Sequence, residues 1–163
     1  MEVFDEKEIS PEEAEESIRE IAEENELLAL ATVSEDSEAF NATAFFVYDE
    51  DFKFYILTEP DTDHCENLRG NPSISLSIYD SRQDWGDEKQ GLQVFGEAEQ
   101  VSEEKIPEVL NLYLERFPGL GEWVSEPDEM EKIDSKFYVV RPDRIKIFDE
   151  PKFGKETWVN VGF

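Results

Sequence analysis

Three side chains near the middle of the chain have the types and the spacing of an anion-binding site. Thr58 ends an apolar run, Thr62 follows four residues later, and His64, the single histidine, stands two residues beyond. Where a loop enters a helix, the first backbone N–H groups are free and carry the positive end of the helix dipole. Two hydroxyls and a protonated imidazole would add donors and a positive charge there. The segment therefore predicts a site for a phosphate or a similar anion, with Asp63 at the same helix start.

A purely structural interpretation of these residues is also open. Thr62 would cap the helix that follows it, and His64 would be a surface residue. Cys65 adds no dyad with His64, because adjacent helical residues point about 100° apart. One histidine and one cysteine exclude a two-histidine metal site, a conventional zinc cluster and an internal disulfide. The sequence contains no Gly-rich phosphate loop, and no catalytic residue is assigned.

The elements that must position these residues are mostly strands. Short apolar or alternating runs between turn residues predict strands at residues 27–33, 39–48, 52–58, 74–79, 92–101, 137–140 and 145–148. Many carry apolar groups on both faces, so we expect a sheet that is filled inside and covered outside. The expected fold is mainly β (α+β), a barrel or sandwich of six to seven antiparallel strands with peripheral helices.

Helices interrupt the strands at three places. Ser10 and Glu13 predict a capping box at the start of the first helix. A short helix is expected over residues 63–69, and a longer one lies within 102–117, before Pro118-Gly119. With no repeat and no low-complexity linker, we expect a single domain over residues 1–163. Its parts are an N-terminal helix at about 10–25, a barrel at about 27–149 and a C-terminal tail at 150–163.

The order of these features resembles the FMN-binding split barrels related to pyridoxamine 5'-phosphate oxidase. Their phosphate-loop pattern is strand, Thr, three residues, Ser or Thr, one residue, Lys, six residues, Asn-Pro and strand. Thr58, Thr62, His64 and Asn71-Pro72 fall at the matching places, with His64 where the family usually has lysine. The chain from residue 145 to its end looks like that of a small subgroup of uncharacterised bacterial and archaeal members.

The resemblance implies a split β-barrel that forms a homodimer, with FMN in a groove between the two subunits. The strand that contains Asn41–Phe46 would run along the edge of the isoalloxazine ring, and Gln93 would reach its pyrimidine part. Characterised oxidases of the family carry an arginine where this chain has Ala42. The candidate cofactor contacts are Thr43, Ala44, Phe45, Thr58, Thr62, Asp63, His64, Gln93, Lys155 and Trp158.

The function that the resemblance implies is an FMN-dependent oxidoreductase of unknown substrate. The flavin would carry the chemistry, while the protein would supply position and electrostatics. Two alternatives remain open, a non-catalytic flavin- or anion-binding module and a deazaflavin-dependent relative. No metal is expected.

Charge is the strongest global signal in the sequence. There are 42 acidic residues against 15 lysines and arginines, the formal net charge is −27, and the acids are spread along the whole chain. Such a surface repels itself at ordinary ionic strength, and molar salt screens that repulsion. We therefore expect a halophilic protein. The same field argues against nucleic acid and anionic membranes as partners.

The sequence also gives an expectation for localisation. Its first residues have no basic region followed by an apolar run, so we expect no signal peptide. No stretch approaches the roughly 18 consecutive apolar residues of a membrane span. The single cysteine, Cys65, suits a reducing compartment. We expect a cytoplasmic protein.

Overall fold

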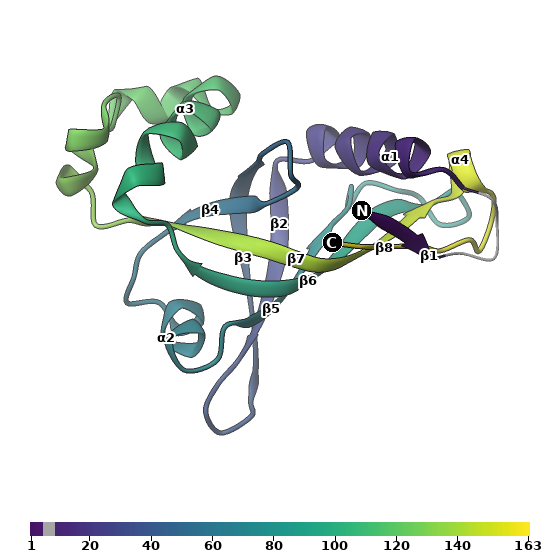
Figure 1. Ribbon diagram of the computed structural model, residues 1–163, viewed down its shortest axis with the longest axis horizontal. Helices are drawn as coiled ribbons and strands as arrows, with labels where there is room; N and C mark the ends of the chain where they lie inside the picture. Colours follow the sequence, from purple (N-terminus) through teal and green to yellow (C-terminus); the bar gives the residue numbers. More distant parts are fainter. Residues whose placement is uncertain (5–8) are drawn as a thin grey trace.

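Six strands close into an antiparallel barrel, and two further strands extend it (Figure 1). The computed structural model describes residues 1–4 and 9–163 of the chain. Its strands are β1 (Glu2–Phe4), β2 (Leu27–Val33), β3 (Ala39–Tyr48), β4 (Phe54–Thr58), β5 (Ser73–Ile78), β6 (Gln90–Gln100), β7 (Lys136–Asp149) and β8 (Val159–Gly162). Its α-helices are α1 (Pro11–Glu24), α2 (Asp63–Gly70), α3 (Ile106–Arg116) and α4 (Glu150–Phe153), with short 3-10 helices η1 (Glu103–Lys105), η2 (Pro118–Glu122) and η3 (Pro127–Lys132).

The barrel closes through β7. The strand order is β7–β4–β3–β2–β5–β6, and β6 pairs back onto β7. The predicted split barrel with peripheral helices is therefore confirmed. The two strands predicted at 137–140 and 145–148 are wrong as separate elements, because β7 is continuous. The chain stays in the sheet through Pro142, which pairs with Gly96 where the register with β6 shifts.

Gly96 allows β6 and β7, the two longest strands, to approach each other closely where their register shifts. A Cβ at this position would lie 2.0 Å from the carbonyl oxygen of Arg141, which is far inside van der Waals contact. Only glycine fits such an approach of two backbones. The barrel closure therefore depends on a residue without a side chain.

Two separate cores show that parts of β3, β4 and β7 are buried on both faces. The inner core fills the barrel, and α1 and α2 close it with Ile18, Ile21, Cys65 and Leu68. The outer core lies between the opposite face of β3, β4 and β7 and the segment of α3, η2 and η3. In Figure 1 this helical segment stands at the upper left, α1 at the upper right and α2 below the barrel.

The predicted capping box fixes the start of α1. The Glu13 backbone N–H donates to Ser10 Oγ at 3.2 Å, and the Ser10 N–H donates to Glu13 Oε2 at 2.9 Å. At the other end, the Arg116 guanidinium donates to the carbonyls of Ala22 and Asn25 at 2.7 and 2.6 Å. A cation on the terminal carbonyls favours the helix dipole, so Arg116 joins α3 to the end of α1.

The last residues belong to the sheet. Residues 150–163 were predicted to form a tail, but in this segment α4 turns the chain and β8 pairs with β7. The N-terminal strand β1 pairs in turn with β8. Asp149 is fully buried at this turn and accepts hydrogen bonds from Ser17 and Gln90 at 2.7 and 2.9 Å. The Ser17 bond attaches α1 to the end of β7, and the Gln90 bond attaches the start of β6 to it. Over the residues that the structure describes, no helix is long and apolar enough to cross a membrane.

Candidate functional site

The three residues of the predicted anion site lie together. Thr58 ends β4, Thr62 precedes α2, and His64 is in the first turn of α2. The His64 Nε2 atom is 2.9 Å from Thr58 Oγ1 and 3.1 Å from Thr62 Oγ1. We call these three residues the hydroxyl–imidazole cluster. His64 is half-buried, so it is not a free surface side chain.

The start of α2 has no side-chain cap. The Thr62 hydroxyl donates to the Glu59 carbonyl at 2.9 Å, and no side chain of the described residues accepts from the first amides of α2. The proposed capping role of Thr62 is therefore not what the structure shows. The first N–H groups of the helix remain available to an anion beside the cluster.

A hollow of about 280 Å³ opens in front of the cluster. Its lining residues are Phe40, Asn41, Ala42, Asp61, Thr62, Asp63 and His64. The helix start and the imidazole suit a phosphate, whereas the exposed carboxylates of Asp61 and Asp63 repel one. Salt screens exposed charges more than half-buried ones, so molar salt weakens the repulsion more than the attraction.

Cys65 lies behind the cluster and is fully buried. Burial raises the pKa of its thiol, but hydrogen bonds with His64, Thr62 and Tyr138 outweigh that effect and the net shift of the pKa is downward. For Tyr138, burial and the contact with Cys65 raise the pKa to about 12. Tyr138 therefore keeps its proton and can donate to the sulfur.

A second group of candidate residues meets on the outer face of β6, β7 and the segment before β8. Gln93 is paired across the sheet with Lys146, whose Nζ lies 4.0 Å from the centre of the Trp158 ring. Trp158 packs on Phe148 with ring centres 4.7 Å apart. Arg144 covers the Phe95 ring at 4.4 Å. We call Gln93, Phe95, Arg144, Lys146 and Trp158 the cation–aromatic patch.

The two cations of this patch have no acidic partner. Among the described residues, neither Arg144 nor Lys146 forms an ion pair. In a chain with 42 acids, two cations without an ion pair beside the Phe95 and Trp158 rings suit a planar anion. Sequence reasoning found Gln93 and Trp158 but missed the two cations. Their alternation in Arg144-Ile-Lys146 was the available signal, because it places both on one face of a strand.

The residues predicted to contact the cofactor do not all lie close together within one chain. Thr43 and Gln93 lie in one cross-strand row, joined through Ala29 and Ser77. Three strand spacings separate them, which is about 14 Å. Ala44 is half-buried beside Thr43, and Phe45 is 53% exposed. Lys155 lies elsewhere, exposed in a hollow that also contains Trp85 and Lys89.

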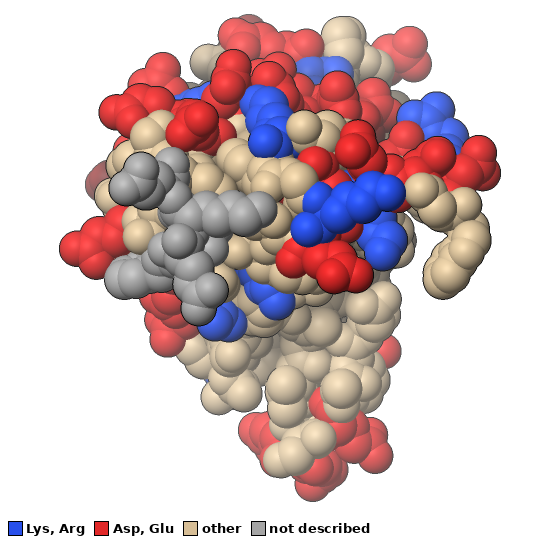
Figure 2. Space-filling view, turned by 90° about the vertical axis from the view of Figure 1, so that its right-hand side faces the viewer, with Lys and Arg blue, Asp and Glu red and all other residues tan. Residues whose placement is uncertain are grey.

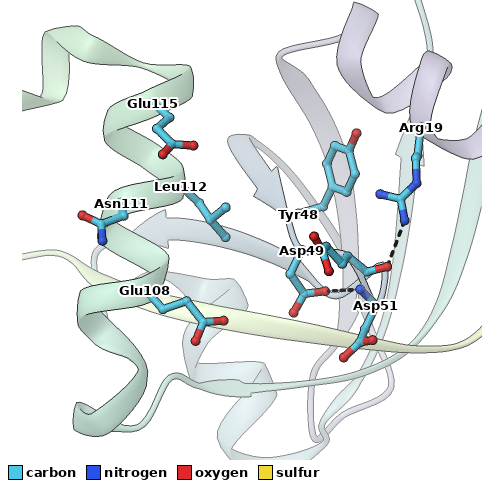
Figure 3. Close-up of a pocket in the computed structure, with 9 residues that line it drawn as sticks. Arg19, Tyr48, Asp49, Asp51, Glu108, Asn111, Leu112 and Glu115 are labelled. Carbon is cyan, nitrogen blue, oxygen red and sulfur yellow. Dashed lines mark hydrogen bonds between the residues drawn. The ribbon is translucent and has the colours of Figure 1, made fainter.

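A larger groove of about 580 Å³ does not fit an anion. It lies between α3 and the β3–β4 turn, and Figure 3 shows its carboxylates on both walls, with Asp49 and Asp51 facing Glu108 and Glu115. Among the described residues its one cation is Arg19, which donates to the Glu50 backbone carbonyl at 3.1 Å and covers the Phe52 ring. The hydroxyl–imidazole cluster is therefore the better anion site, although its hollow is smaller.

The sequence is similar to a known protein family and to curated proteins. The family model described as pyridoxamine 5'-phosphate oxidase matches residues 14–149. A UPF0306 protein from Klebsiella pneumoniae is 29% identical over 131 residues, which are 76% of this chain and 78% of the relative.

Two of the similar solved structures illustrate the shared fold. The heme binding protein from Mycobacterium smegmatis has a TM-score of 0.74 at 16% identity, over 94% of this chain and 59% of that one. HutZ, the heme storage protein from Vibrio cholerae, has a TM-score of 0.64 at 22% identity, over 77% of this chain and 87% of that one. At these identities the likeness shows the split-barrel fold.

Proposed function

This chain belongs to the pyridoxamine 5'-phosphate oxidase family, and from that premise we propose that it binds FMN and acts as a flavin-dependent oxidoreductase. The observation that carries the proposal is the hydroxyl–imidazole cluster at the uncapped start of α2. The free N–H groups at this helix start, with His64 beside them, fit the phosphate of FMN, and that phosphate is the part of the cofactor that a helix start holds best.

Each group of candidate residues has a role in this proposal. The free N–H groups at the start of α2 hold the phosphate beside Thr58, Thr62 and His64, and the edge of β3 from Thr43 to Phe45 lies along the ring. Bound flavin supplies hydride and electron transfer. The protein's own residues bind the cofactor, orient it and limit the access of water. No side chain is assigned as a proton donor.

A second copy of the chain supplies the other half of the site. The cation–aromatic patch lies about three strands away from Thr43, so one subunit cannot enclose a flavin between its own two groups. Leu27 and Phe45 are directly paired on β2 and β3, and both are about half exposed, at 51% and 53%. Figure 2 shows a mostly uncharged belt between the acidic upper part of the molecule and the acidic tip of the β2–β3 hairpin. The exposed apolar pair of Leu27 and Phe45 suits a two-fold interface.

The dimer has a direct test. In molar KCl the parent protein should sediment as a dimer at micromolar concentration, and Leu27→Glu should sediment as a monomer, because it places a charge in an apolar interface. Leu27 is exposed in the single chain, so the substitution should leave the fold intact. The matched control is Trp85→Glu in a fully exposed loop, which should remain dimeric. A monomeric parent protein would contradict the shared site.

Heme is the rival ligand, because two proteins with this fold are named for it. The only histidine is His64, and its Nε2 lies within hydrogen-bond distance of two hydroxyls, so binding of iron to that nitrogen would have to break both contacts. Titration of the purified protein with FMN and with heme, followed by absorbance in molar KCl, tests the proposal. Saturable FMN binding supports it, and reduction by a nicotinamide separates an oxidoreductase from a carrier module. Saturable binding of heme without FMN would contradict it.

A further inference from the structure

An aromatic pocket lies where the helical segment meets the barrel, between β3, β4 and the α3–η2 connection. It has a volume of about 360 Å³ and is lined by Phe45, Leu57, Tyr113, Phe117, Gly119, Leu120 and Trp123. The Phe45 and Phe117 rings pack edge-to-face at 5.4 Å, and Tyr113 packs on Phe117 at 5.8 Å. Trp123 is 72% exposed and forms an open wall. Flat rings thus surround a small space.

The pocket offers nothing to a charged ligand. Among the described residues, no charged side chain lines it. Its one hydroxyl, that of Tyr113, is directed at the backbone carbonyls of Phe45 and Tyr55, each at 3.0 Å. Arg116 covers Phe117 at 5.7 Å, but its guanidinium donates to the carbonyls at the end of α1. An anion would find no partner here and would also meet the net charge of −27.

The position of the pocket connects it to the proposed flavin site. Phe45 lines this pocket, and Asn41 and Ala42 of the same strand line the hollow beside the hydroxyl–imidazole cluster. Four residues of a strand span about 13 Å. A flavin with its phosphate at the cluster and its ring along β3 extends toward the aromatic pocket.

We propose that this pocket binds an uncharged aromatic molecule of one or two rings, the substrate class of the flavin site. The substrate role rests on the proposed function, whereas the class of ligand follows from the pocket itself. Its volume lies at the lower end of ligand sites, which excludes large molecules. Aromatic rings stacked or edge-on to Phe117 and Trp123 are the contacts that the lining offers.

Calorimetric titration of the FMN-free protein in molar KCl tests the ligand class. The probe is 2-naphthol, which is uncharged, and its comparison is naphthalene-2-sulfonate, which carries a charge on the same rings. The parent protein should bind 2-naphthol saturably and the sulfonate at least about tenfold more weakly. Trp123→Ala should weaken 2-naphthol binding roughly tenfold, because it removes one aromatic wall. The matched control Trp85→Ala removes a fully exposed tryptophan outside the pocket and should change nothing.

Three outcomes would overturn the assignment. They are no saturable binding of 2-naphthol, equal binding of the sulfonate, and equal affinity in Trp123→Ala and the parent. If the parent does not bind 2-naphthol and Trp123→Ala no longer forms a dimer, the pocket belongs to the subunit interface instead. FMN titration of the same preparations distinguishes failure of the proposed function from failure of the pocket assignment. Failure to bind FMN contradicts the proposed function, whereas failure to bind 2-naphthol contradicts only the pocket.

Discussion

As KCl is lowered from molar concentration to about 0.1 M, the protein should lose much of its thermal stability. At 1 M salt the Debye length is about 3 Å, and at 0.1 M it is about 10 Å, so repulsion among neighbouring carboxylates returns on dilution. The formal net charge is −27, and the eight ion pairs of the described residues all involve partly exposed side chains. Such pairs contribute little and cannot offset the excess of acid.

Helix α1 shows the size of the effect. Its glutamates are Glu12, Glu13, Glu15, Glu16, Glu20, Glu23 and Glu24. Six pairs among them are three or four residues apart, and like charges at these spacings cost a few tenths of a kcal/mol each, about 1–3 kcal/mol in total. Lys152 contacts Glu16 and Glu20 and relieves only part of this. With the rest of the surface added, we expect the melting temperature to fall by at least about 5–10 °C.

Circular dichroism melts across a KCl series measure this directly. The double substitution Glu12→Gln with Glu24→Gln removes three of the six close pairs and should flatten the dependence on salt. Sucrose at matched water activity is the control, because it stabilises by exclusion and does not screen charge. A melting temperature that stays constant down to 0.1 M KCl would rule out the halophilic interpretation.

Replacing His64 by Ala should weaken FMN binding about tenfold to a hundredfold. The substitution removes one charge-assisted hydrogen bond, worth roughly 1.5–3 kcal/mol, and molar salt favours the lower end of that range. His64→Lys should restore or strengthen binding, because an ammonium group also pairs with phosphate. Fluorescence titration with FMN at fixed molar KCl gives the dissociation constants of all three proteins.

Removing an acidic side chain from the rim of the same hollow should have the opposite effect on FMN affinity. Asp61 is exposed beside the cluster, so Asp61→Asn should tighten FMN binding by removing a repulsive charge. Melting curves of each variant separate a local effect from a loss of fold. If His64→Ala binds FMN as tightly as the parent, His64 is not a phosphate ligand and the site assignment fails.

The parts of the structure predicted correctly from the sequence are those with local causes. The Ser10–Glu13 capping box and the start of α2 depend on residues a few positions apart, and the spacing of Thr58, Thr62 and His64 follows from a strand, a loop and one helical turn. Alternation of apolar residues was also sufficient to predict most strands, because the period of two is imposed by the pleat itself.

The rest depends on pairings between distant segments. The continuity of β7 through Pro142 is set by its register with β6, and β8 is a strand because β7 offers it an edge. The contact between Lys146 and Trp158 likewise arises from β7 lying beside the segment that leads into β8. Such pairings are fixed by register rather than by local pattern, so the sequence alone did not reveal the cation–aromatic patch.

The most direct test of the central claim compares FMN with riboflavin, which has the same ring system and no phosphate. Both ligands are titrated against the parent protein and His64→Ala in molar KCl, with flavin fluorescence as the readout. If the hydroxyl–imidazole cluster holds the phosphate, the parent should bind FMN at least about tenfold more tightly than riboflavin. His64→Ala should lose most of that preference and keep its affinity for riboflavin. Equal affinity of the parent protein for the two ligands, or binding of neither, would contradict the account.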